Sequence, residues 1–215
     1  IEVLLGDDLE PVERLGDVGI ADSRIAAIGG PGDGSVASAE IEIDGTGLLL
    51  TPGFVDPHTH YDAQLFWDPT ASPSNVHGVT TVIAGNCGFT LAPLAPGDGD
   101  YVRRMMAKVE GMPLQALEDG IEWNWSSFEE YLDRLSGRLG VNAGFLVGHC
   151  ALRRQVMGTE SVEREATEAE IAAMRELLAE GIRAGGLGFS TTRARTHSDG
   201  DGKPVSSRWA SEAEL

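Results

Sequence analysis

The sequence predicts an α/β protein in which the first strands of a (β/α)₈ barrel of the TIM type follow a small β-rich module. Two observations predict this fold. From residue 48 onward, short apolar segments alternate with segments of helical periodicity, which is typical of parallel strands joined by helices. Each apolar segment also ends in polar or metal-binding residues, and functional residues of such barrels gather at the carboxyl ends of the strands.

Residues 1–47 form the β-rich module. Val18 and Ile20 alternate with polar neighbours, residues 21–24 can turn the chain, and residues 25–28 can return it as a hairpin. This module contains no plausible cluster of catalytic residues.

Residues 48–215 form the barrel portion and contain about four βα units. Their strands are nearly continuous apolar runs, as in parallel sheets that are buried on both faces. The expected strands cover residues 48–55, 79–84, 143–147 and 186–189. Capping boxes in Ser126-Ser-Phe-Glu-Glu130 and Thr167-Glu-Ala-Glu170 predict helix starts, and a helical patch at 101–108 lies within the long connection 89–125.

The barrel is predicted to be incomplete, because a full one takes about 250 residues and eight strands. We therefore expect this chain to be the N-terminal portion of a longer enzyme. A doubly wound sheet is the alternative fold. It usually carries a glycine-rich phosphate loop at the first strand–helix turn, whereas this turn carries His-Thr-His.

The strongest chemical signal is the pair His58 and His60 at the end of the first strand. Alternate residues of a strand point to the same side, so both imidazoles would reach one point and suit a zinc-type ion. Cys87 ends the neighbouring strand, where a thiolate could join that ion. From the residues alone, Cys87 is either a ligand or a small buried apolar residue.

Composition narrows the possible partners. The chain carries a net charge of −18, which disfavours binding to nucleic acid or to an anionic membrane. Two cysteines are too few for a disulfide framework and favour a reducing, cytoplasmic compartment. No apolar run approaches the roughly 18 residues of a membrane span.

Two motifs resemble a known family. Thr51-Pro-Gly-Phe-Val-Asp-Pro-His-Thr-His60 resembles the first-strand signature of the amidohydrolase superfamily. Gly78-Val-Thr-Thr-Val-Ile-Ala-Gly-Asn-Cys-Gly88 is similar to its D-aminoacylase (N-acyl-D-amino-acid deacylase) branch, in which a second-strand cysteine is a zinc ligand. Further similarity covers residues 123–133, 148–153 and 186–193.

The resemblance implies that His58, His60 and Cys87 bind one or two zinc ions and that residues 1–47 are part of a small β-sandwich. The family's other zinc histidines and its catalytic aspartate come from later strands, which have no counterpart here. The implied reaction is hydrolysis of the linear amide bond of a small N-acyl-D-amino acid by a metal-activated water.

Three further residues are candidates for the substrate pocket. His149 is expected to end the third strand and to face the barrel mouth, and Ser190 ends the fourth strand. Arg193 could bind a substrate carboxylate or form a structural ion pair.

Two other functions stay open. Hydrolysis of a cyclic amide, as in dihydroorotase- or hydantoinase-like relatives, is disfavoured because those enzymes use a fourth-strand lysine and residues 186–192 contain none. Alternatively, the chain is a non-catalytic portion that needs a partner chain, or the remainder of the same enzyme, to be stable.

Overall fold

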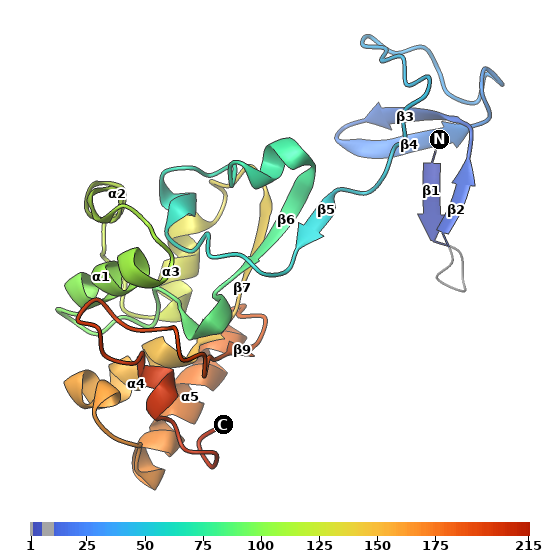
Figure 1. Ribbon diagram of the computed structural model, residues 1–215. Coiled ribbons are helices and arrows are strands. Elements are labelled where there is room, and N and C mark those ends of the chain that lie inside the picture. The colour runs from blue at the N-terminus through green and yellow to red at the C-terminus, as the bar shows by residue number, and fades with distance from the viewer. Residues whose placement is uncertain (1, 6–10) are drawn as a thin grey trace. The chain divides into compact units, whose positions relative to one another are not determined.

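A computed structural model describes residues 2–5 and 11–215 of the chain (Figure 1). The chain separates after Gly53 into two compact units, whereas the sequence predicts a boundary after residue 47. The two units are described separately below.

The N-terminal unit contains two antiparallel hairpins. Strand β1 (Glu2–Leu5) pairs with β2 (Pro11–Arg14), and β3 (Asp17–Ala21) pairs with β4 (Arg24–Gly29). Asp22 and Ser23 join β3 to β4 with positive φ angles of 52° and 60°, the twist that a two-residue hairpin turn requires. The predicted hairpin is therefore confirmed, while the β-sandwich remains a prediction.

The C-terminal unit is built on parallel strands. These are β5 (Phe54–Asp56), β6 (Val79–Ala84), β7 (Asn142–Phe145), β8 (Val147–Gly148) and β9 (Phe189–Ser190). A three-stranded sheet has the order β5-β6-β7, and β8 pairs with β9. Only Leu146 separates β7 from β8, so the predicted third strand carries the chain from one sheet to the other.

The first strand is shorter and more exposed than the sequence predicts. Val79 begins β6 and pairs with Phe54, so the pairing between the two strands starts at Phe54. β5 also lies at the sheet edge, and Phe54 and Val55 are 58% and 59% exposed. The prediction of a buried strand over residues 48–55 is wrong in this respect, because burial depends on neighbours on both sides.

Helices fill two of the connections. α1 (Gly99–Val109), α2 (Leu114–Asp119) and α3 (Phe128–Leu135) lead from β6 to β7, and α4 (His149–Met157) and α5 (Glu168–Arg183) lead from β8 to β9. Both predicted capping boxes are present, with Ser127 and Thr167 as the N-caps. The connection from β5 to β6 contains short 3₁₀ turns and no α-helix, unlike a regular βα unit.

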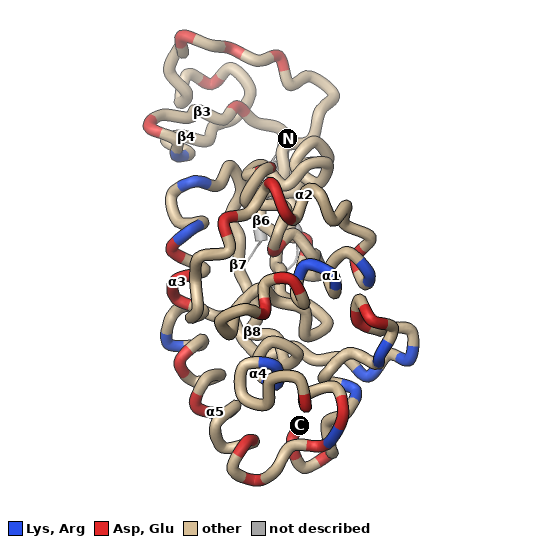
Figure 2. The backbone as a smooth tube through the Cα atoms, turned by 90° about the vertical axis from the view of Figure 1, so that its left-hand side faces the viewer, with Lys and Arg blue, Asp and Glu red and all other residues tan. Residues whose placement is uncertain are grey.

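The core of the C-terminal unit lies between these helices and the strands. Tyr131 of α3 is fully buried, packs edge-on against Phe145 of β7, and donates a hydrogen bond to the backbone carbonyl of Asp62. Acidic residues outnumber basic ones, 34 to 16, and are spread along the chain (Figure 2). Among the described helices, none has the length and apolarity needed to cross a membrane.

Candidate metal centre

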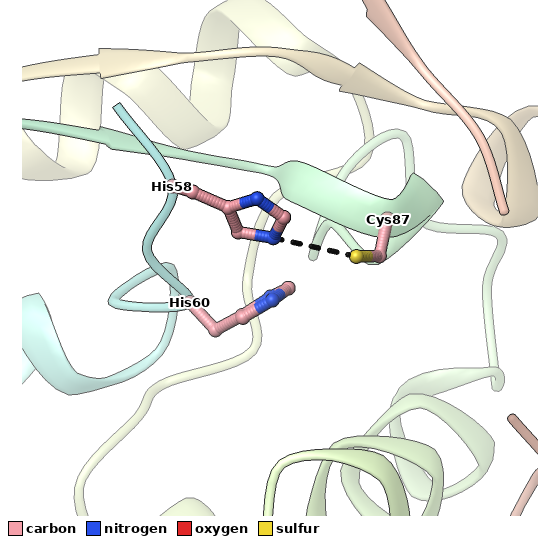
Figure 3. A group of neighbouring side chains, drawn as sticks. All are labelled: His58, His60 and Cys87. Atoms are coloured by element: carbon pink, nitrogen blue, oxygen red, sulfur yellow. Dashed lines mark hydrogen bonds between the residues drawn. The ribbon is translucent and has the colours of Figure 1, made fainter. Parts of the chain in front are cut away.

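The three predicted ligands meet at the carboxyl edge of the parallel sheet. His58 and His60 lie in the segment that follows β5, and Cys87 lies in the 3₁₀ turn Asn86–Gly88 that follows β6. Figure 3 shows their side chains directed toward one space. One ligand atom from each residue lies within 4.8 Å of the others, in the one such group of metal-binding side chains found among the described residues.

The distance between the thiol and one of the imidazoles fits a tetrahedral ion. Zinc binds sulfur at about 2.3 Å and imidazole nitrogen at about 2.0–2.1 Å, which places a sulfur and a nitrogen ligand about 3.6 Å apart at the tetrahedral angle. Cys87 Sγ lies 3.5 Å from His58 Nε2. The residues present therefore suit a zinc-type ion in both chemistry and spacing.

The backbone at Cys87 adopts an unusual conformation. Its φ and ψ angles are 55° and 15°, a left-handed conformation that costs a residue with a Cβ about 1–3 kcal/mol. Gly85 and Gly88 on either side have φ angles of 78° and 79°. This sharp turn ends β6 and directs the thiol toward the two imidazoles.

Asn86 ties the cysteine turn to the histidine segment. Its side-chain amide donates to the backbone carbonyls of Ile83, at 2.9 Å, and Thr59, at 3.3 Å. Thr59 lies between the two histidines, and its own N–H and hydroxyl both donate to the carbonyl of Ile83. The strand end that carries the imidazoles and the turn that carries the thiol are thereby joined by hydrogen bonds.

Ser190 fixes the same turn from the other side. Its hydroxyl donates to the carbonyl of Gly85 and accepts a 3.0 Å hydrogen bond from the N–H of Gly88. A side chain at Gly88 would come within 3.3 Å of the Thr191 backbone, which leaves little room for a larger residue there. The structure places Ser190 as a support of the cysteine turn, and its contact with substrate stays a prediction.

Electrostatics favour the neutral imidazole at His60. Burial first, and then the nearby His58 and His197, lower the pKa of His60 to about 4. Burial, together with the negative charge of Glu110, raises the pKa of the Cys87 thiol. At neutral pH the site therefore holds an unprotonated imidazole and a protonated thiol, so metal binding must release the thiol proton.

His149 does not end a strand, as the sequence predicts, but begins α4, since the chain turns into a helix directly after Gly148. Its imidazole is buried, with Nδ1 2.9 Å from Thr191 Oγ1 and Nε2 2.8 Å from Glu214 Oε1. Arg153, which is fully buried, donates to both oxygens of the Glu214 carboxylate. Both nitrogens thus have protein partners, and a pocket role for His149 stays a prediction.

Arg193 is exposed in the segment after β9 and forms no ion pair with another described residue. Its predicted role at a substrate carboxylate is still a prediction.

Three residues that lie near the predicted site residues were not identified from the sequence. Glu110 lies beside His60, Glu214 pairs with His149, and His197 accepts or donates a 3.0 Å hydrogen bond at Thr192 Oγ1. None follows a strand end or belongs to a recognised motif. A signal could have come only from the three-dimensional packing of distant segments.

Comparison with known proteins places this chain in a family. The family model described as "Amidohydrolase family" matches residues 42–214, which include all three candidate ligands. The chain belongs to the amidohydrolase family. The resemblance seen in the two sequence motifs is therefore confirmed.

Curated relatives include two deacylases of Alcaligenes xylosoxydans xylosoxydans. Its D-aminoacylase is 41% identical over 179 residues, covering 83% of this chain and 34% of the relative. Its N-acyl-D-aspartate deacylase is 40% identical over 179 residues, covering 83% and 33%. This amidohydrolase chain thus spans about a third of the length of these relatives.

Solved structures show the same fold. A D-aminoacylase studied for its binuclear metal center superposes with a TM-score of 0.70 at 36% identity, covering 99% of this chain and 41% of that one. N-acyl-D-glutamate deacylase from Bordetella bronchiseptica, in complex with zinc and a phosphonate inhibitor, gives 0.68 at 32% identity, covering 93% and 37%. These two matches confirm the prediction that the chain has the α/β architecture of the amidohydrolases.

Proposed function

We propose that this chain supplies the first part of the metal site of a zinc-dependent amidohydrolase that deacylates N-acyl-D-amino acids. The observation that carries the proposal is the convergence of two imidazoles and one thiol at the carboxyl edge of the sheet. The deacylase relatives, one of them solved with zinc and a mimic of a tetrahedral intermediate, support the choice of metal and of substrate class.

In the proposed reaction, water adds to the amide carbonyl, the C–N bond breaks, and the proton from water goes to the leaving amine. A bound zinc ion would supply an activated water and polarise the carbonyl. His58, His60 and Cys87 would hold the ion, the last as a thiolate. Asn86 and Ser190 keep the cysteine turn at a fixed distance from the imidazoles.

The proposal also concerns the remainder of the enzyme to which this chain would belong. The remaining zinc histidines and the carboxylate that moves the proton would come from sequence outside these 215 residues. The exposed outer edge of β5 supports further strands of the same enzyme beside it, and the parallel strands support about four βα units of a (β/α)₈ barrel. Residues 1–47 would be part of a β-sandwich, and the enzyme would be cytoplasmic.

The test is to measure zinc content and hydrolysis in the whole protein that contains this chain. His58→Ala, His60→Ala and Cys87→Ala should each lower bound zinc and abolish release of D-amino acids from N-acyl-D-amino acids. His77→Ala, at an exposed position before β6, is the matched control and should change neither.

Two results would contradict the proposal. Full zinc content in the Cys87→Ala protein would show that Cys87 is not a zinc ligand. Turnover of hydantoins, with no turnover of N-acyl-D-amino acids, would favour a cyclic-amide hydrolase.

A further inference from the structure

Glu110 presents a carboxylate to one of the proposed metal ligands. Its Oε1 lies 3.4 Å from His60 Nδ1, and the two side chains are 16% and 20% exposed. Neither the strand-end pattern nor the family motifs include this residue. Its proximity to His60 arises from the way in which α1 packs against the core.

The position of Glu110 is fixed by its backbone. It directly follows α1 as the C-cap of this helix, and its N–H donates a 3.0 Å hydrogen bond to the carbonyl of Met106. Met105 and Met106 are buried in the core and anchor this end of the helix. Gly111 then turns the chain away with a φ angle of 67°. The backbone of Glu110 is therefore held in place, and its largely buried side chain lies beside the imidazole.

The Nδ1 atom of His60 needs a partner. It is buried and has no hydrogen bond of good geometry within the protein. A neutral imidazole carries its proton on one nitrogen and a lone pair on the other. A proton on Nδ1, facing Glu110, would leave the lone pair of Nε2 for a cation.

Other nearby carboxylates do not serve His60 in this way. Asp62, which is fully buried, accepts a 3.0 Å hydrogen bond from the N–H of Gly85. Asp56 accepts from the backbone N–H of His58 at 3.3 Å. Among the described residues, Glu110 is the acid placed against the His60 ring.

The net charge of the proposed metal site also favours a carboxylate beside His60. A divalent cation bound by two neutral imidazoles and the Cys87 thiolate would keep one uncompensated positive charge. The Glu110 carboxylate, which lies against the ligand His60, would offset this positive charge without binding the ion itself. Carboxylate–histidine pairs of this kind fix the tautomer and orientation of metal-ligating histidines, and their loss costs about 10–100-fold in metal affinity.

We propose that Glu110 is a positioning residue for His60: its carboxylate accepts a hydrogen bond from Nδ1–H and thereby assigns Nε2 to the metal. This inference rests on the proposed metal site and concerns metal binding, so it is tested without substrate. If zinc binds as stated and N-acyl-D-amino acids are not hydrolysed, the substrate assignment fails and the role of Glu110 stands.

The first test measures zinc affinity of the whole protein by competition with a chromophoric chelator. Glu110→Ala should weaken binding about 10–100-fold. Glu110→Gln keeps an acceptor oxygen but loses the negative charge, so it should recover part of that loss. Glu118→Ala, which removes an exposed carboxylate in the neighbouring helix α2, is the control and should bind like wild type.

Two outcomes of this test would overturn the proposal. Equal affinity of Glu110→Ala and the control would show that the carboxylate does not act on the site. Equal loss in Glu110→Ala and Glu110→Gln would show that its charge acts and its hydrogen bond does not.

A second test needs no variant and so does not depend on their folding. In cadmium-substituted protein with isotope-labelled histidine, NMR should show coupling of His60 Nε2 to the metal and a proton on Nδ1. Coupling of the metal to Nδ1 would refute the assignment.

Discussion

Replacement of Asn86 by Asp tests whether the amide of Asn86 holds the metal-site segments together. The change keeps the shape of the side chain and replaces its NH₂ donor by a second oxygen. In the wild-type protein that NH₂ group has two hydrogens, and its nearest acceptors are the carbonyls of Ile83 and Thr59. Both hydrogen bonds are lost in the variant.

The cost can be worked out from the partners that remain. The carbonyl of Ile83 still accepts from the N–H and hydroxyl of Thr59, so it stays satisfied. Asn86 is the donor found for the carbonyl of Thr59, and a buried acceptor that loses its partner costs about 1–3 kcal/mol. A buried carboxylate facing carbonyl oxygens adds the penalty of an unpaired charge, so we expect a total of about 3–5 kcal/mol at neutral pH.

The penalty should depend on pH with a definite sign. Burial beside carbonyl oxygens raises the folded-state pKa of an aspartate at this position above its unfolded value. The protonated acid regains one donor, so the destabilisation should shrink as the pH falls toward 4 and grow as the pH rises.

The assay is urea unfolding of the metal-free protein followed by tryptophan fluorescence. Asn124→Asp, at an exposed position, is the control and should change the unfolding free energy by less than about 0.5 kcal/mol. An Asn86→Asp protein as stable as this control at neutral pH would refute the reasoning.

Two further predictions concern the turn and the buried ion pair. Because residue 87 has a left-handed backbone, Cys87→Gly should be more stable than Cys87→Ala by about 0.5–1 kcal/mol in urea unfolding of metal-free protein. Equal stability of the two variants would show that the backbone at residue 87 is not strained. Glu214→Gln leaves Arg153 buried without a counter-charge and should cost about 3–5 kcal/mol. Burial opposes ionisation of Glu214, but hydrogen bonds from His149 and Arg153 lower its pKa, so its stabilisation is present above pH 4.5 and is lost as the pH falls below that value. A Glu214→Gln protein with wild-type stability at pH 7 would refute this role.

Local patterns predicted α1, α3 and α5, but they did not predict α2 or α4. The capping boxes at Ser127 and Thr167 are set by residues three positions apart, and both are present in the structure. The extent of β5 could not be predicted in this way. Leu48, Leu49 and Leu50 are apolar enough for a strand, yet β6 begins opposite Phe54, and β5 starts at that residue. Strand length depends on the register of a partner, which a local pattern does not contain.

The sequence by itself determined that three candidate metal ligands come together. His58, His60 and Cys87 each follow a strand of the parallel sheet, and parallel strands bring their carboxyl ends to one edge. This consequence of chain direction needs no knowledge of side-chain packing.

Only the tertiary structure decided which acids accompany the histidines. Glu110 reaches His60 from the end of α1, and Glu214 reaches His149 across 65 positions of sequence. Neither pair has a spacing that helical or strand periodicity would mark. Such contacts follow from how helices and loops pack around the strands, and this packing is settled by the fit of many apolar side chains at once.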